Sequence, residues 1–509
     1  MKRVLFLTLT TVCAWVAIPA LFNWAQETKP TDEAPKIHTE TFDLTIYPKA
    51  EPVPALKYKF LPDAFERNSG NAASLYLKAM GFLEQNTARK KLFEIEVAAE
   101  AKAQTEQVGI ADLPPLSYLD TPPSKYPIEE VKEYLKHTAF QPSILEQAWQ
   151  RDRFEMDRQV KDSKNPFAIL IPEVQGIRDL ARKQSIRCRL AIAENRIDDA
   201  IKIVGQQYAM ARHLGQDDFL VSALVGCAIQ GIATEDIYYL VQNPDCPNLF
   251  WAASRLPKPL IDWEHCVASE YHFIDLQFAK LNQVNTQLKS EAYWQEFISE
   301  LAEEMKANGV FYWSGNGMHE EPKLSPDPIS EIQKHISSNY VAAKEFLIQQ
   351  SIVGPDKIDS YPKAQVFFLA MKHHFEQARD ELFKWTNVAL HQGSQQIEAI
   401  ERKNTDRSRP EFTWLSEFLF AGHSMRAVQA RSLQRMLLIQ AVEGIRLYGA
   451  AHDGKLPESL ADLPYPLPVD PASGQPLMYA KKGDTATITT APAGKVRAEL
   501  YIRFAERGK

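Results

Sequence analysis

Residues 172–240 constrain the fold more than any other part of the chain, because apolar residues recur there at helical spacing almost without interruption. The pattern predicts a helix over Pro172–Ala193, whose proline falls in the first turn, where helices tolerate it. A second helix is predicted over Ile197–Leu214, and a third ends near Leu240. Small residues at the expected crossings indicate an αα-hairpin like those of helical-repeat proteins, although no second copy follows at a fixed period.

The third helix is apolar on nearly every side over Phe219–Ala233. Such a helix lies either in a protein core or in a membrane. The run is short for a membrane span and acidic residues bracket it, so we predict a core helix that Asp217 or Asp218 caps. Glycine inside a helix costs about 1 kcal/mol relative to alanine. Gly226 and Gly231 therefore predict close contacts with neighbouring helices.

The remaining chain predicts a mainly α protein. Helical patterns cover most of 64–310 and 331–452, and a loop rich in glycine and proline separates them at 311–330. The second part contains a helix-packing seam with alternating spacings of three and four: Phe368, Met371, Phe375, Ala378, Leu382 and Trp385. Its last helix is expected from about 412 to 452.

Over residues 453–509 the helical pattern ends and the alternation typical of strands begins. A hairpin is predicted around Lys482–Asp484, and Val496–Phe504 alternates apolar and polar residues like a half-buried strand. We therefore expect a helical-hairpin array followed by a small C-terminal antiparallel β-sheet. The turns at 470–474 and 482–484 are expected to be the exposed tips of a docking module.

The N-terminus has an export pattern. Lys2 and Arg3 precede an apolar run that extends from Val4 to about Trp24. At about 1.5 Å per residue this run, residues 4–24, is long enough to cross a membrane. Residues 1–25 are thus a signal or membrane anchor. The poor cleavage site favours an anchor whose basic end stays cytoplasmic. Residues 26–63 contain six prolines and predict an extended tether.

Composition narrows the possible partners. The chain is 45% hydrophobic and 24% charged, as globular proteins are, and its net charge of -7 gives no electrostatic case for nucleic acid. The five cysteines form no C-x-x-C pair, which argues against zinc ribbons. For Cys188, Cys227, Cys246 and Cys266 we expect four small buried residues. The alternative is a disulfide between Cys246 and Cys266, which export would permit.

No catalytic, cofactor-binding or metal site is predicted. The densest group of ligand-type residues is His265, Cys266, Glu270 and His272, which lacks a complete set. Two further groups predict a solvated polar face, one of His373, His374 and Glu376, the other of Glu331 and His335. The run Gly422-His423-Ser424-Met425-Arg426 lacks the closing glycine of a nucleophile elbow.

A basic run lies along the first hairpin helix and comprises Arg178, Arg182, Lys183, Arg187 and Arg189. The expected interpretation is a solvated helix face that pairs with nearby acids. The alternative is a docking surface for an anionic partner.

Several segments resemble a family of uncharacterised, exported, mostly helical proteins of planctomycete-type bacteria. They are Asn71-Ala72-Ala73, Leu75-Tyr76-Leu77, Ala211-Arg212-His213-Leu214-Gly215, Pro247-Asn248-Leu249-Phe250-Trp251, Leu256-Pro257-Lys258-Pro259-Leu260, Glu443-Gly444-Ile445-Arg446-Leu447-Tyr448 and His452-Asp453-Gly454-Lys455-Leu456-Pro457. The C-terminal module, with Asp470-Pro471 and Gly474-Gln475-Pro476, is loosely similar to type II secretion pseudopilins. The resemblance implies a place in the bacterial cell envelope and implies no particular reaction.

Two hypotheses of function follow. The first is a non-catalytic envelope protein that scaffolds or docks partners, is held on the membrane through residues 4–24, and binds an envelope protein. If the signal is cleaved, the same protein would be periplasmic. The second is an extracytoplasmic, hydrolase-like enzyme with a site between helices. A pocket lined by converging polar or titratable groups would favour the enzyme.

Overall fold

The computed structural model describes residues 37–81, 87–163, 166, 169–308, 327–404, 410, 412–413, 415, 419 and 422–506. The predicted signal or anchor at 1–25 lies outside these residues, as does most of the predicted loop 311–330. The described chain is mainly helical with a small sheet formed at its C-terminal end, which confirms the predicted fold class.

The chain forms two compact units. Unit 1 comprises the described residues within 1–157, 171–267 and 426–509, and unit 2 comprises those within 158–170 and 268–425. This division differs from the expected division into 64–310 and 331–452. The reason is that the last helix and the tail share one hydrophobic core with the first half of the chain.

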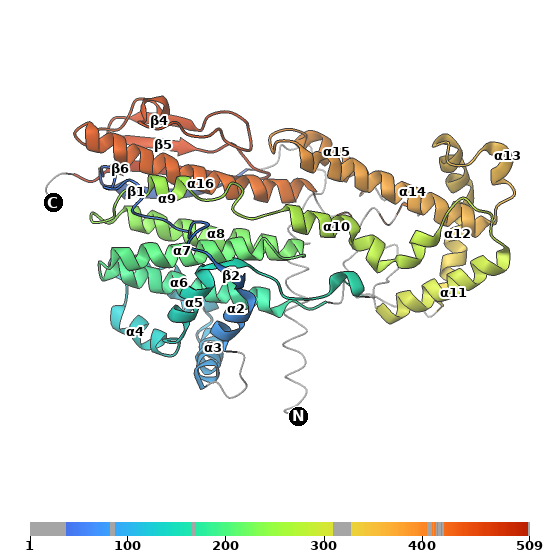
Figure 1. The fold of residues 1–509 in the computed structure, drawn as a ribbon, viewed down its shortest axis with the longest axis horizontal. Helices are drawn as coiled ribbons and strands as arrows, with labels where there is room; N and C mark the ends of the chain where they lie inside the picture. The colour runs from blue at the N-terminus through green and yellow to red at the C-terminus, as the bar shows by residue number, and fades with distance from the viewer. Residues whose placement is uncertain are drawn as a thin grey trace. The chain divides into compact units, whose positions relative to one another are not determined.

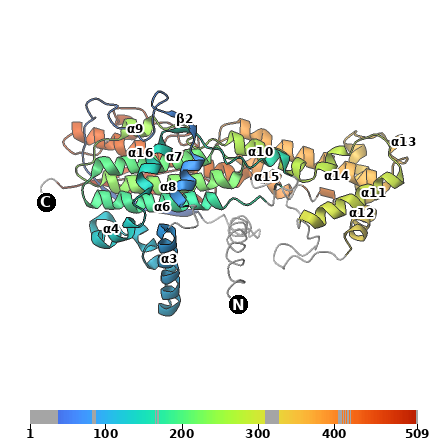
Figure 2. The same ribbon diagram turned by 60° about the horizontal axis from the view of Figure 1, so that its bottom comes forward.

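Unit 1 contains the predicted hairpin, α6 (Pro172–Ala193) and α7 (Ile197–Leu214), followed by α8 (Leu220–Val241). These three helices lie side by side (Figure 1). The other helices of this unit are α2 (Ala73–Met80), α3 (Thr87–Glu106), α4 (Ile128–Lys136), α5 (Gln141–Trp149), α9 (Phe250–Ser254) and, from Arg426 onward, α16 (Gly422–Ala451). Helix α3 stands away from the other helices of unit 1 (Figure 2).

Local chemistry explains the hairpin. Asn195 takes φ of 57° in the turn between the helices, a left-handed conformation that asparagine tolerates. Asp198 and Asp199 lie in the first turn of α7, and Arg212 in its last turn, so each charge complements the helix dipole. The expected bounds of α6 and α7 are therefore confirmed.

Helix α8 is a core helix. Among the described helices it is long and apolar enough to cross a membrane, but 61% of its apolar window is buried inside the protein. A Cβ at Gly226 would lie 2.8 Å from the carbonyl oxygen of Ala211, and one at Gly231 would lie 3.2 Å from the Arg435 guanidinium. The predicted close contacts at both glycines are confirmed.

The predicted cap of α8 is wrong. Phe219, and neither aspartate, occupies the N-cap position of the helix. Asp217 is buried and its carboxylate accepts a hydrogen bond from the Ser222 hydroxyl instead.

The sheet has four strands in the order β1-β6-β5-β4. The hairpin of β4 (Met478–Lys482) and β5 (Thr485–Thr489) turns at Gly483, whose φ is 61°. Strand β6 (Val496–Phe504) runs antiparallel to β5, as predicted. The sheet covers one side of α16, with α6, α7 and α8 on the other side (Figure 1). A separate pair is formed by β2 (Asn68–Asn71) and β3 (Arg151–Arg153).

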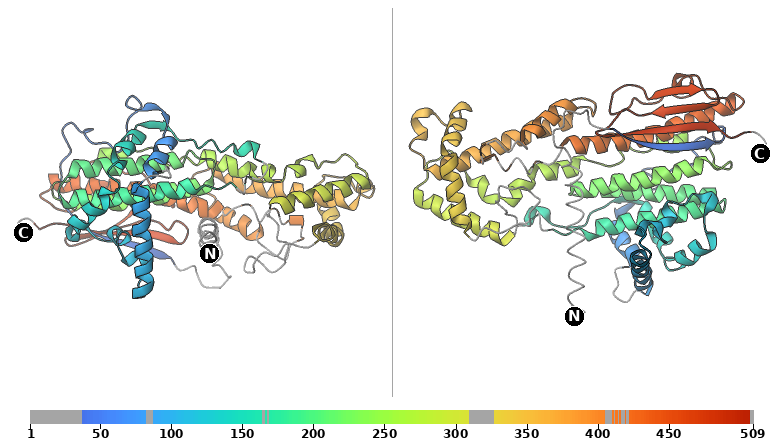
Figure 3. Two further views of the ribbon diagram at one scale, coloured as in Figure 1. Left: turned by 90° about the horizontal axis from the view of Figure 1, so that it is seen from below. Right: turned by 180° about the vertical axis from the view of Figure 1, so that it is seen from behind.

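Two expectations fail at the N-terminal edge of this sheet. Strand β1 (His38–Ile46) lies along β6 and is parallel to it, so the sheet is mixed and not antiparallel (Figure 3). The described part of the expected tether 26–63 is therefore an ordered part of unit 1. Leu44 and Ile46 are buried on the inner face of the sheet, and Phe60 is buried further along. Burial of these apolar side chains outweighs the extended preference of the prolines between them.

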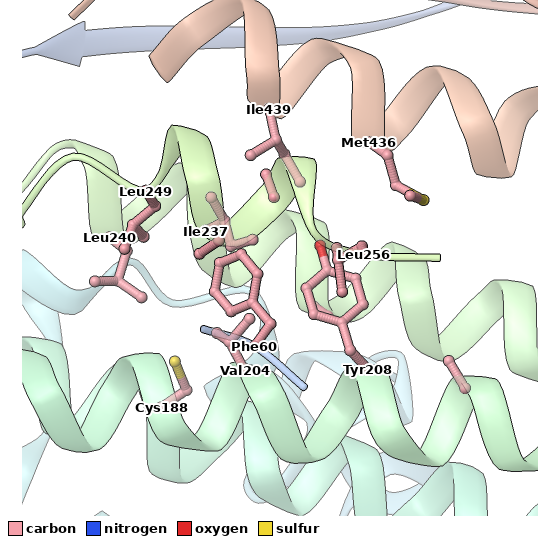
Figure 4. Packing of buried hydrophobic residues seen from close by; sticks show 14 of the residues in the cluster. Phe60, Cys188, Val204, Tyr208, Ile237, Leu240, Leu249, Leu256, Met436 and Ile439 are labelled. Atoms are coloured by element: carbon pink, nitrogen blue, oxygen red, sulfur yellow. The ribbon is translucent and has the colours of Figure 1, made fainter. Parts of the chain in front are cut away.

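The core of unit 1 joins segments that are distant in the sequence. Figure 4 shows residues from the 59–67 segment, α7, α8, the loop after α9 and α16 in one cluster: Phe60, Val204, Tyr208, Ile237, Leu256 and Ile439. Gly205 permits this packing, because a Cβ there would lie 2.3 Å from the carbonyl oxygen of Phe60. The 59–67 segment therefore crosses α7 at a glycine.

Unit 2 has its own core. Its helices are α11 (Glu291–Asn308), α12 (Pro328–Gln349), α13 (Pro355–Ile358), α14 (Lys363–Phe383), α15 (Ser394–Asn404) and, from residue 268, α10 (Glu264–Gln277). Trp294 stacks on Phe368 with ring centroids 5.9 Å apart. Five residues of the predicted seam are buried on α14, whereas Trp385 follows the helix and is half-buried.

Candidate functional site

The basic run of α6 ends inside the protein. Arg189 is 2% exposed and donates to Asp236 at 3.3 Å and to Glu235 at 2.8 Å. Asp236 also accepts hydrogen bonds from Ser185 and Gln207, each at 2.8 Å. Burial raises the pKa of Asp236 to about 6, and Arg189 opposes that rise. The network fastens α6, α7 and α8 to one another.

Arg187 is buried beside this network and has neutral partners. Its guanidinium donates to Gln184 at 2.8 Å, to Gln141 at 2.9 Å and to the carbonyl oxygen of Thr138 at 3.0 Å. Burial lowers its pKa to about 10. The expected solvated face is therefore wrong for Arg187 and Arg189, because both side chains turn inward and take their partners from neighbouring segments.

A second buried ion pair joins α16 to the N-terminal segment. Arg446 donates to both carboxylate oxygens of Glu443 at 2.9 Å, to the carbonyl oxygen of Cys246 at 2.7 Å and to that of Tyr47 at 3.1 Å. Asn248 donates to the carbonyl oxygen of Glu443 at 2.9 Å. Burial raises the pKa of Glu443, and Arg446 opposes the rise. These contacts clamp three segments, and every named partner is a group of the protein itself.

A third buried contact joins α2 to α7. The Nε2 atom of His213 lies 3.0 Å from the carbonyl oxygen of Arg151, which can only accept, so Nε2 carries the proton. The Tyr76 hydroxyl therefore donates to Nδ1 over 2.7 Å. Burial lowers the pKa of His213 to about 4, so the ring is neutral near pH 7.

The residues considered as metal ligands do not converge. His265 pairs with Asp218 at 2.8 Å, whereas His272 lies 3.5 Å from Asp275. Cys266 is buried and donates to the carbonyl oxygen of Trp263. Across the part of the chain that the structure describes, no three side chains of the metal-binding types come together as a ligand set.

The four described cysteines are free and buried, as expected, and the alternative disulfide between Cys246 and Cys266 is wrong. The tail also departs from its predicted role at one turn. Asp470 is buried and accepts hydrogen bonds from Gln434 at 2.9 Å and from the Ala491 amide at 2.8 Å. The 470–474 turn is therefore anchored to α16 at Asp470 and is not an exposed tip.

Unit 1 also carries an open pocket of about 240 Å³. It forms where the 59–67 segment meets the end of α9, and its lining residues are Lys59, Phe60, Leu61, Pro62, Asp63, Ala64, Arg67, Ala252, Arg255, Leu256 and Pro257. Phe60 and Leu256 belong to the core, so the apolar part of the lining is fixed. We call this the basic pocket.

Positive charge dominates the basic pocket. Lys59 pairs with Glu66, and Arg255 lies 3.8 Å from Asp63. The Nε–H group of Arg67 donates a hydrogen bond to the carbonyl oxygen of Pro62 at 3.2 Å. Within the described residues no carboxylate lies within 4 Å of the Arg67 guanidinium.

Two further cations lie near the pocket. Burial lowers the pKa of Arg212 on α7, the like charge of Arg67 lowers it further, and the Asp152 carboxylate opposes the fall. Lys258 follows the last lining residue, and burial lowers its pKa. Neither has a carboxylate within 4 Å among the described residues. Basic groups without a close carboxylate partner among the described residues therefore lie both in the pocket and beside it.

A rigid frame holds the basic groups in place. The Trp149 indole donates to the carbonyl oxygen of Phe60 at 2.8 Å. Asp63 then caps a tight turn, since its carboxylate accepts from the amides of Phe65 and Glu66 at 3.1 Å each. In return the Asp63 amide donates to Glu66 at 3.1 Å. These hydrogen bonds fix the backbone of the turn from which Asp63 and Arg67 reach the pocket.

Sequence reasoning missed the basic pocket because five of its eleven lining residues come from the segment interpreted as a tether, 26–63. One available signal was the spacing of Asp63 and Glu66, which is typical of a capped turn. Nothing in the sequence placed Arg255 beside that turn.

Comparisons of the chain with protein families, with curated proteins and with solved structures found no match. The segments that carry the family resemblance have clear roles in this fold. Tyr76 and His213 form one buried contact, and Asn248, Glu443 and Arg446 form another. These motif residues are determinants of the fold of unit 1.

Proposed function

We propose that the protein is an exported, non-catalytic envelope protein that docks an anionic group of a partner in its basic pocket. The observation that carries the proposal is a set of cations in and beside the pocket that have no carboxylate within 4 Å among the described residues: Arg67 in its lining, and Arg212 and Lys258 next to it. A fold with a net charge of -7 that concentrates basic groups in one pocket favours an acidic ligand.

Two buried arginines of unit 1 support the same proposal by comparison, because they have the carboxylate partners that Arg67 and Arg212 lack among the described residues. Arg189 and Arg446 are satisfied by carboxylates and carbonyl groups inside unit 1. Arg67 and Arg212 have no carboxylate within 4 Å among the described residues, so their charge is available to a ligand. The apolar run at 4–24 and the resemblance to exported proteins support an envelope location.

Titration calorimetry tests this proposal. The full chain in neutral detergent micelles is titrated with a hexaglutamate peptide at low and high salt. We expect binding that weakens with salt, because the contacts are electrostatic and exposed to solvent. Arg67→Glu should abolish the binding. Arg402→Glu, which makes the same charge change at an exposed arginine of unit 2, should leave it unchanged.

Two results would overturn the proposal. The first is a chain that binds no hexaglutamate at any salt concentration. The second is equal binding by Arg67→Glu and by Arg402→Glu. Circular dichroism on each variant confirms that a loss of binding does not reflect a loss of fold.

A further inference from the structure

The turn that lines the basic pocket also exposes an aromatic side chain. Phe65 is 99% exposed, although it lies between Ala64 and Arg67, which both line the pocket. Its amide is held by Asp63, so the ring is presented by an ordered turn. An aromatic side chain this exposed, held next to the cations of the pocket, is available for a contact that forms on binding.

Two more apolar side chains are exposed on the preceding turn. Val53 is 93% exposed and Leu56 is 54% exposed. That turn is closed by the Lys57 amide, which donates to the carbonyl oxygen of Pro54 at 3.0 Å. Three exposed apolar residues thus occur within thirteen residues of the chain, with Lys57 and Lys59 between them and Arg67 two residues after the last.

Interleaved aromatic, aliphatic and basic residues fit a membrane surface with anionic lipids. Apolar side chains enter the boundary between headgroups and acyl chains, while lysine and arginine stay at the level of the phosphates. An acidic protein surface would match the cations but would leave Phe65 and Val53 in water. The combination therefore favours a lipid partner over an acidic protein.

The length of the chain before β1 agrees with this partner. If residues 4–24 span the membrane, residues 25–37 connect that span to β1. Thirteen extended residues reach at most about 45 Å. Unit 1 would then remain close to the bilayer surface.

We infer that the anionic group docked in the basic pocket is the phosphate of a lipid headgroup, and that Phe65 enters the membrane interface beside it. This inference rests on the proposed function and names its partner. In the docked state Arg67 and Arg255 contact the headgroup, while Val53, Leu56 and Phe65 lose contact with water.

A fluorescent probe on the turn tests the inference. The full chain carries Cys13→Ser and Phe65→Cys labelled with nitrobenzoxadiazole, since the four remaining cysteines are buried. It is placed in nanodiscs of phosphatidylcholine alone or of an equimolar mixture with phosphatidylglycerol. We expect the emission to shift to shorter wavelength, and dithionite access to be lost, in the anionic discs. A matched probe at Met478→Cys, an exposed position on β4, should stay accessible in both.

The outcomes separate this inference from the proposed function. If hexaglutamate binds the pocket but the probe at position 65 remains as accessible as the probe at 478, the lipid partner is wrong and an acidic protein partner remains. If neither occurs, both proposals fail. If the probe enters both kinds of disc equally and Arg67→Glu does not prevent it, the headgroup contact is overturned.

Discussion

At the residue scale, two buried arginines hold unit 1 together. Arg189 joins the three central helices through Asp236, and Arg446 joins α16 to the N-terminal segment through Glu443 and backbone carbonyl groups. A buried charge is costly unless it is paired and fully hydrogen-bonded, and both arginines meet that condition. Such groups specify one arrangement of segments, because any other arrangement would leave a charge unpaired.

Removing one partner of the second pair should be strongly destabilising. Glu443→Gln leaves the buried Arg446 without its carboxylate, and we expect a loss of about 3–5 kcal/mol in the free energy of unfolding. Asp179→Asn breaks an exposed pair with Arg182 on α6 and should cost less than about 1 kcal/mol. Denaturant unfolding of both variants checks the difference. Equal losses would show that burial of the pair is unimportant.

His213 should make stability depend on pH. Its folded-state pKa of about 4 lies below the unfolded value of 6.5, so the stabilising effect is fully present above pH 6.5. It is lost as the pH falls towards 4, by roughly 3 kcal/mol in total at about 1.4 kcal/mol per pKa unit. Asp236, whose pKa is raised to about 6, acts in the opposite direction over part of this range.

Comparison with His213→Gln isolates the histidine. Unfolding free energies of both proteins are measured between pH 7 and pH 4. The parent protein should lose stability relative to the variant as the pH falls. Parallel pH profiles would contradict the account, because they would mean that folding does not lower the pKa of His213.

Among the helices and strands, those whose bounds depend on local periodicity were predicted correctly from the sequence. The bounds of α6, α7 and β6 follow from helical spacing and from strict alternation, and the structure confirms them. Strand β1 was missed although Phe42, Leu44 and Ile46 alternate with polar residues, because prolines surround it and its partner lies about 458 residues away. Pairing over that distance leaves no local signal.

The buried positions of Arg187 and Arg189, and the basic pocket, were missed because they too depend on contacts between distant segments. Arg187 and Arg189 have the spacing of an exposed stripe, and only the arrival of Thr138, Gln141 and Asp236 from other segments makes them internal. A single sequence shows which residues are charged but does not show which segments will surround them.

Strand β1 provides a test of the corrected element assignment. A chain that lacks residues 1–36 keeps β1, whereas a chain that lacks residues 1–46 exposes the edge of β6 and removes Leu44 and Ile46 from the core. We expect the longer truncation to lower the melting temperature and to remove hydrogen-exchange protection from β6, because buried apolar side chains and ladder hydrogen bonds are lost together. The shorter truncation should do neither. Identical behaviour of the two would restore the tether interpretation.

At the scale of the whole molecule, the chain consists of two units with separate cores. Unit 1 is assembled from three stretches of sequence, and its buried clamps hold the 59–67 segment and α9 in the positions that create the basic pocket. The proposed docking function therefore depends on long-range packing and not on any local motif.

If the proposed function is right, the basic pocket is the surface through which this chain contacts its partner in the envelope. Site-specific photocrosslinking in cells that make the protein tests it most directly, with benzoylphenylalanine at Ala64 in the pocket or at Asp484 on the exposed β4–β5 turn. We predict an adduct at position 64 that Arg67→Glu removes, and none at position 484. An adduct at 484 alone, or one at 64 that Arg67→Glu leaves unchanged, would contradict the claim.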